Sequence, residues 1–128
     1  MSGINYLLDT NVVIGLLKAF PDAIDLLQQY PDMLEKCAIS QITRMELLSF
    51  SGLDIESIDQ IQAFLENCRI ILLDEYIEEA AIVLRRSGRF KLPDAIIAAT
   101  AQLSGLTLLT LDERLAKAVM AGETNGSK

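Results

Sequence analysis

Short apolar runs alternate with longer segments of helical periodicity along the whole chain. The apolar runs fall at residues 4–8, 37–39, 70–73 and 107–110. Runs of this length are typical of strands that are buried on both faces of a parallel sheet. Between and after them, Ile, Leu, Val and Ala recur at helical spacing. The alternation predicts an α/β fold with a central, mostly parallel sheet of four to five strands and helices on both faces.

Polar residues, prolines and glycines predict where the helices begin and end. Thr10 or Asn11 can cap a helix that follows the first strand. Later helices are expected to begin at Pro21, Ser40, Asp54, Asp74, Pro93 and Asp112. The helix after Ser40 is expected to reach Phe50, and Gly88 and Gly105 suit helix ends.

The composition is that of one ordinary globular domain, which we expect over residues 1–121. Of the 128 residues, 51% are hydrophobic and 23% charged, so a core can form without disulfides. Residues 122–128 are small and polar, which predicts a flexible tail. Cys37 and Cys68 form no CxxC pair and are expected to be buried free thiols. We expect no leader sequence, because no basic segment followed by an apolar stretch opens the chain, and no apolar run approaches the roughly 20 residues that span a bilayer. We therefore expect a cytoplasmic protein without membrane association.

The chain contains no histidine and carries a formal net charge of −7. The lack of histidine excludes Ser-His-Asp and Cys-His nucleophiles and imidazole zinc sites. A catalytic base would have to be a carboxylate, a lysine or a metal-bound water. Nucleic acid selects basic surfaces, so a chain this acidic would need divalent cations to act on it.

Four acidic residues stand where a site would form. Asp9 and Asp112 follow strand ends, and ligands of parallel α/β sheets gather at the carboxyl ends of the strands. Glu46 lies among apolar residues of a predicted helix, and Asp94 lies in the first turn of a nearly apolar one. Each also has a purely structural interpretation. Asp9 and Asp112 can be helix caps, Asp94 can complement a helix dipole, and Glu46 can pair with a base such as Arg44.

Converging carboxylates would repel one another and raise each other's pKa values, and a divalent cation removes that problem. All-oxygen sites suit Mg²⁺ or Mn²⁺ and not zinc. Such a site favours phosphodiester hydrolysis, in which one metal orients and deprotonates a water and a second stabilises the leaving oxygen.

Four segments resemble the motifs of the PIN-domain ribonucleases. In chain order they are residues 7–14 (LLDTNVVI), 40–47 (SQITRMEL), 92–101 (LPDAIIAATA) and 108–112 (LLTLD). Their order and spacing cover nearly the whole chain, and its size is similar to that of VapC-type toxins of toxin–antitoxin pairs. The resemblance implies a PIN-like three-layer sandwich and Mg²⁺- or Mn²⁺-dependent endoribonuclease activity.

The resemblance also implies roles for individual residues. The acids that would bind metal and carry out catalysis are Asp9, Glu46, Asp94 and Asp112. Asn11 and Thr110 would be polar supports that hydrogen-bond the acids or metal-bound waters. The chain departs from the family at one point. Many relatives have a phenylalanine shortly after the last acid, where this chain has Glu113, Arg114 and Leu115.

A basic cluster lies just before Asp94. It consists of Arg85, Arg86, Arg89 and Lys91, four of the chain's 11 basic residues. The cluster is either a solvated helix end or a phosphate-binding lip for RNA. The resemblance further implies a homodimer and an antitoxin whose tail enters the acidic site. Candidates for an antitoxin groove are Phe20, Leu26, Leu27 and Phe50.

Two alternatives to a ribonuclease stay open. An acidic receiver-like signalling module is also α/β, is of similar length and binds Mg²⁺. Receivers usually have paired acids after the first strand and a lysine after a late strand, whereas here Asp9 is single and no lysine accompanies Asp112. The other alternative is a catalytically silent PIN domain that only binds RNA or an antitoxin.

Overall fold

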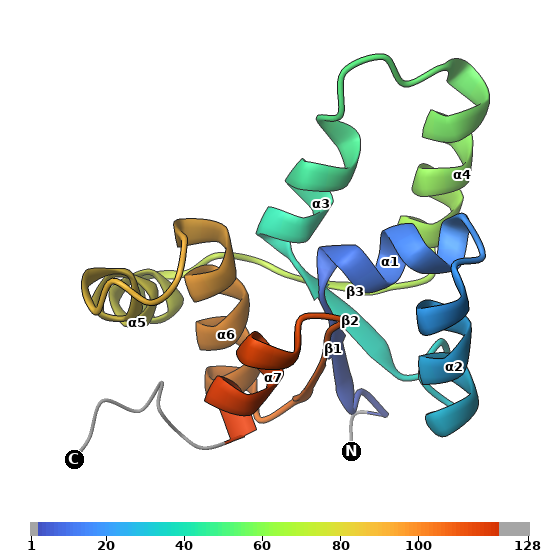
Figure 1. The fold of residues 1–128 in the computed structure, drawn as a ribbon. Helices are drawn as coiled ribbons and strands as arrows, with labels where there is room; N and C mark the ends of the chain where they lie inside the picture. Colours follow the sequence, from blue (N-terminus) through green and yellow to red (C-terminus); the bar gives the residue numbers. More distant parts are fainter. Residues whose placement is uncertain (1–2, 121–128) are drawn as a thin grey trace.

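The computed structural model describes residues 3–120, in which four strands form one parallel sheet (Figure 1). The strands are β1 (Tyr6–Leu8), β2 (Cys37–Ser40), β3 (Arg69–Ile71) and β4 (Thr107–Leu109). Their order is β3-β2-β1-β4, and each neighbouring pair is parallel. The predicted α/β fold is confirmed, and the described sheet is parallel throughout. The predicted tail at residues 122–128 lies outside the described residues.

Seven described helices cover the two faces of the sheet and its carboxyl edge (Figure 1). They are α1 (Thr10–Leu17), α2 (Pro21–Gln29), α3 (Gln41–Leu48), α4 (Ile55–Glu66), α5 (Glu75–Arg86), α6 (Leu92–Ser104) and α7 (Glu113–Met120). Helices α5, α6 and α7 pack on one face, and α1, α2 and α4 pack on the other. None of these helices is long and apolar enough to cross a membrane.

Both faces of β1 and β4 are buried at their leucine positions, which explains the consecutive apolar residues there. Successive side chains of a strand point to opposite faces of a sheet. Leu7 and Leu108 pack with α5, α6 and α7, whereas Leu8 and Leu109 pack with the helices of the other face. None of the four is more than 8% exposed. A strand between two helix layers therefore needs apolar residues at every position.

The helix caps follow the sequence with one exception. The predicted caps of three helices are confirmed at Ser40, Asp54 and Asp74, whose side chains accept backbone N–H groups. The exception is α1, where the caps Thr10 and Asn11 are wrong and the alternative interpretation of Asp9 as a helix cap is confirmed. The Asp9 Oδ1 atom accepts the backbone N–H of Thr10 at 2.7 Å. The first acid of the site is thus also the residue that begins α1.

Two predicted segments extend two residues beyond the observed carboxyl ends. The third strand was expected over residues 70–73, but β3 ends at Ile71, and Leu72 is 64% exposed. Ile71 pairs with Ser40, the last residue of β2, so the following residues have no strand to pair with. Helix α3 ends at Leu48, and Phe50 lies beyond it with 46% of its surface exposed.

The two cysteines lie side by side on β2 and just before β3. Their Sγ atoms are 3.6 Å apart, and both cysteines are free. Cys37 is buried as predicted. The prediction is wrong for Cys68, which is partly exposed because it lies beside the edge strand of the sheet.

Candidate active site

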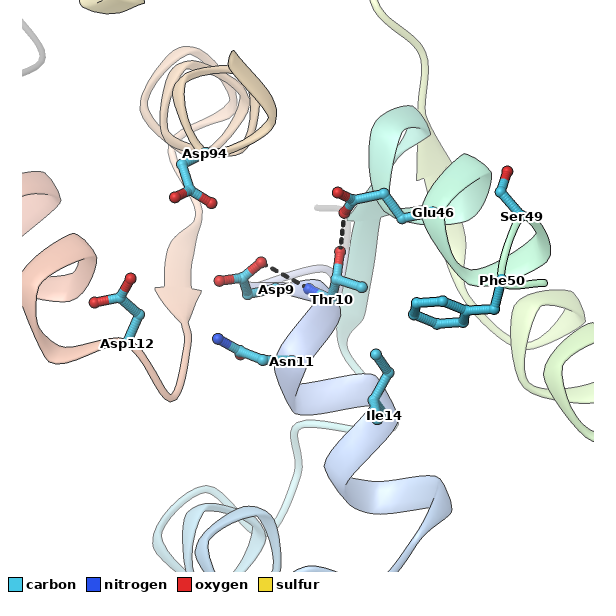
Figure 2. Close-up of a pocket in the computed structure, with 9 residues that line it drawn as sticks. All are labelled: Asp9, Thr10, Asn11, Ile14, Glu46, Ser49, Phe50, Asp94 and Asp112. Carbon is cyan, nitrogen blue, oxygen red and sulfur yellow. Dashed lines mark hydrogen bonds between the residues drawn. The ribbon is translucent and has the colours of Figure 1, made fainter. Parts of the chain in front are cut away.

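A pocket of about 470 Å³ opens at the carboxyl ends of β1 and β4. Its lining includes all four predicted acids: Asp9, Glu46, Asp94 and Asp112. They come from the start of α1, from α3, from the first turn of α6 and from the turn before α7. Figure 2 shows the Asp9, Asp94 and Asp112 carboxyl groups turned toward one space, with Glu46 approaching from the α3 side. The fold therefore brings together acids that are far apart in the sequence.

Asp9 is the most enclosed of these acids, with 4% of its surface exposed. Its Oδ1 atom accepts the Thr10 N–H, and its Oδ2 atom accepts the Thr110 hydroxyl at 2.7 Å. Burial raises the pKa of Asp9, and the charges of Asp94 and Glu46 add to the rise, while the two hydrogen bonds oppose it. The two hydrogen bonds therefore hold both carboxylate oxygens of Asp9 in one orientation. The buried surroundings disfavour the negative charge of this carboxylate.

Thr110 and Asn11 connect the turn after β4 to helix α1. The Thr110 oxygen accepts the Asp112 N–H at 3.0 Å and the Asn11 side-chain amide at 3.3 Å. The Asn11 Oδ1 atom accepts the Leu111 N–H at 3.1 Å. Thr110 thus touches Asp9 directly, whereas Asn11 acts one bond further away. Together these bonds fix the segment that carries Asp112 beside Asp9.

Asp112 both lines the pocket and caps α7. Its Oδ1 atom accepts the N–H groups of Arg114 at 3.0 Å and Leu115 at 3.3 Å. The structural and functional interpretations of this residue are therefore compatible. Asp94 lies across the pocket, where burial raises its pKa, followed by the charges of Asp112 and Glu46. Arg114 and Lys91 oppose that rise.

Glu46 is partly buried, as its apolar neighbours in the sequence predict. Its Oε1 atom accepts the Thr10 hydroxyl at 2.7 Å (Figure 2). The alternative pairing with Arg44 does not occur, and Arg44 lines a different pocket beside α4. Lys36 and Asp32 form an ion pair at 3.6 Å, and neither residue lines this pocket.

The predicted basic cluster lies outside the acidic pocket. Arg85, Arg86, Arg89 and Lys91 are exposed, and none of them lines it. Lys91 is close enough to Asp94 for its charge to lower the pKa of that acid. Arg114, which was not among the predicted site residues, has the same effect from α7. Its place two residues after Asp112 was a signal that could have found it.

A second, more apolar pocket adjoins the acidic one between α1, α3 and α4. Its apolar lining consists of Ile14, Leu17, Leu47, Phe50, Leu53 and Ile61. Ile14 and Phe50 line both pockets. Of the predicted groove residues, Phe50 alone lies here. Leu26 and Leu27 are partly buried against the core and Phe20 is exposed outside both pockets, so a role of these three residues in an antitoxin groove stays a prediction.

The chemistry of the acidic pocket fits a divalent cation. Its donors are carboxylate, hydroxyl and amide oxygens, which suit Mg²⁺ or Mn²⁺. In residues 3–120, no three Asp, Glu, His or Cys side chains are close enough together to hold one ion. Mg²⁺ usually keeps several waters and binds through one or two carboxylates. The arrangement therefore fits a cation that is bound directly by few acids and reaches the others through water.

The described sheet is all-parallel in the order β3-β2-β1-β4, and acids line a pocket at its carboxyl edge. This is an α/β protein with an acidic site. The PIN domain family matches residues 6–119 of the chain. The chain therefore belongs to the PIN domain family. The order does not fit the receiver-like alternative, because in the order 2-1-3-4-5 the first strand lies between the second and third. Here β1 lies between β2 and β4.

Several solved structures contain chains that are similar to this one. A toxin–antitoxin complex from Klebsiella pneumoniae has a chain with 34% identity, a TM-score of 0.73, and coverage of 86% of this chain and 88% of that chain. A chain of VapBC-1 from nontypeable Haemophilus influenzae has 26% identity and a TM-score of 0.70. The match covers 93% of this chain and 94% of that chain. A chain of FitAcB from Neisseria gonorrhoeae has 26% identity and a TM-score of 0.67, and the match covers 90% of this chain and 93% of that chain. Among curated protein sequences, none is significantly similar to this chain.

Proposed function

We propose that this chain is a Mg²⁺- or Mn²⁺-dependent endoribonuclease that hydrolyses RNA phosphodiester bonds. The observation that carries the proposal is the single pocket that is lined by four acids from four segments. A chain without histidine has few other ways to activate water near neutral pH. The similarity to a chain of a toxin–antitoxin complex supports a role as the toxin of such a pair.

The residues that would hold the metal, some directly and the others through water, are Asp9, Asp94, Asp112 and Glu46. When bound, the cation supplies a water of lowered pKa and stabilises the charge of the leaving oxygen. Asp9 is the central ligand, because its two hydrogen bonds fix both oxygens before any ligand arrives. Thr110 keeps Asp9 in place, and Asn11 keeps Thr110 in place.

The apolar pocket supports an antitoxin partner. Because Ile14 and Phe50 line both pockets, a bound segment can continue from the apolar surface into the acidic site. An antitoxin segment with an apolar stretch followed by a basic residue would fit the two adjoining pockets. The apolar stretch would lie in the apolar pocket, and the basic group would contact the carboxylates. Such a segment would block the site. A homodimer and a cytoplasmic location stay predictions.

Metal dependence of RNA cleavage tests the proposed function. We expect the purified chain to cleave single-stranded RNA with Mg²⁺ or Mn²⁺ present and to stop when EDTA is added. We also expect either ion to raise the melting temperature, because a ligand that binds the folded state stabilises it. Metal binding without cleavage would instead identify the silent alternative. A chain that neither binds the ions nor cleaves RNA would contradict the proposal.

We expect two basic side chains, those of Lys91 and Arg114, to bind the RNA backbone beside the acidic pocket. Replacing Lys91 or Arg114 with alanine should raise the KM for RNA roughly 3- to 10-fold and reduce the salt dependence of binding by about one phosphate contact. The charges of both side chains lower the pKa of Asp94, which lines the pocket. The matched control is Lys36→Ala, because Lys36 precedes β2 at the opposite edge of the sheet. An equal effect of this control on KM would refute a local role for either residue.

A further inference from the structure

A fully buried threonine lies behind the acidic pocket. Thr43 of α3 is 0% exposed, and its Oγ1 atom lies 3.0 Å from the Oγ1 atom of Thr10. The Thr10 hydroxyl in turn lies 2.7 Å from Glu46 Oε1. Two hydroxyl groups thus form a chain that ends on an acid of the pocket. Thr43 does not line the pocket itself.

The direction of this hydrogen-bond chain follows from the number of protons available. An ionised carboxylate only accepts hydrogen bonds, so Thr10 donates its single hydroxyl proton to Glu46. Thr10 then has no proton left for Thr43, so their 3.0 Å contact is a hydrogen bond when Thr43 donates to Thr10. The Thr43 hydroxyl therefore determines how the Thr10 hydroxyl is turned.

We infer that Thr43 is a positioning residue for the proposed RNA cleavage. Its buried hydroxyl orients Thr10, and Thr10 holds the Glu46 carboxylate at the edge of the acidic pocket. Glu46 has three rotatable side-chain bonds, so without this hold it would sample several positions. The inference rests on the proposed function, because it assigns Thr43 to the same site.

A second buried threonine shows what a purely structural hydroxyl does in this chain. Thr100 of α6 is 1% exposed, and its hydroxyl donates to the Ile96 carbonyl of the same helix at 2.7 Å. This local bond is the usual solution for a threonine inside a helix. The Thr43 hydroxyl instead contacts α1, at the residue that follows Asp9. Because valine matches threonine in shape, Thr→Val at each position removes only the hydroxyl.

The test compares Thr43→Val, Thr43→Ser and the matched control Thr100→Val. We expect Thr43→Val to lower kcat for RNA cleavage about 10-fold with KM unchanged, in the range typical of residues that orient metal ligands. We also expect it to raise the Mn²⁺ concentration at which thermal stabilisation is half-complete. Serine restores the hydroxyl and should restore both values. Thr100→Val should leave kcat, KM and the Mn²⁺ midpoint at the wild-type values.

A double variant tests whether Thr43 acts through Thr10. Thr10→Val removes the contact with Glu46, so adding Thr43→Val to it should lower kcat no further. A further 10-fold loss in the double variant would overturn the inference, as would equal behaviour of Thr43→Val and Thr100→Val in an active enzyme. A wild-type chain that neither cleaves RNA nor binds Mn²⁺ would overturn the proposed function itself, and with it this inference. The two failures are therefore distinguishable.

Discussion

Asp9→Asn is expected to lower metal-dependent RNA cleavage by more than about 100-fold while preserving the fold. Asparagine keeps the shape of the side chain and is an equally good helix cap, so α1 can still begin at this position. It removes the negative charge from the centre of the acidic pocket. The measurement is cleavage of single-stranded RNA by wild type and variant, purified identically, across a range of Mn²⁺ concentrations.

The same substitution is expected to stabilise the metal-free protein at neutral pH. Burial raises the pKa of Asp9 above its ordinary value of 3.8. Between that value and the raised one, the folded state binds more protons than the unfolded state, so wild-type stability falls as pH rises through this window. It stays lower above the window, where Asp9 is ionised in both states. Asparagine has no such dependence, so the stability gain should be present at pH 7 and absent below about pH 3.8.

Thermal unfolding with and without Mn²⁺ separates the two effects of Asp9→Asn. Without metal, the variant should melt at a higher temperature than wild type at pH 7. With Mn²⁺, wild type should gain stability and the variant should gain much less, because its central ligand is lost. Equal cleavage by the two proteins would remove Asp9 from the catalytic site. Equal stabilisation by Mn²⁺ would show that the ion binds elsewhere.

The strand positions could be predicted from sequence because burial on both faces leaves a simple pattern. Leu7 and Leu8 belong to opposite core layers, yet both are apolar, and this distinguishes a central parallel strand. The pattern fails at the sheet edge. Leu72 extends the apolar run of β3, but β2 has already ended at Ser40, so no partner remains. Strand ends depend on the neighbouring strand, which hydropathy along one segment does not describe.

The acids of the pocket could be predicted because their positions are local features of the chain. Asp9 and Asp112 follow strands, and a parallel sheet brings the carboxyl ends of its strands to one edge. The hydroxyl chain from Thr43 could not be predicted in the same way. It joins residues 33 positions apart and depends on how α3 packs against α1. The position of Arg114 two residues after Asp112 is visible in the sequence, but the effect of its charge on Asp94 depends on where α7 lies.

Gly15→Ala is expected to destabilise the protein by about 1–3 kcal/mol, the cost of overpacking a core. In an exposed helix the same change would stabilise by roughly 0.5–1 kcal/mol. Here a Cβ atom on Gly15 would lie 2.7 Å from the Cβ atom of Ala23, so α1 and α2 would have to move apart. Since Asp9 caps α1, this contact also supports the helix that carries the site. Urea unfolding of the wild type and the variant measures the loss.

Ala23→Gly supplies the control, because it removes the atom that Gly15→Ala would contact. Alone, it should destabilise α2 by about 1 kcal/mol through the lower helix propensity of glycine. In combination with Gly15→Ala it relieves the clash, so the double variant should be more stable than the sum of the single losses predicts. Additive losses in this double-mutant cycle would show that the close approach of α1 and α2 at these positions does not limit stability. A favourable coupling would show that glycine at position 15 sets the separation of the two helices, and hence the position of the helix that Asp9 begins.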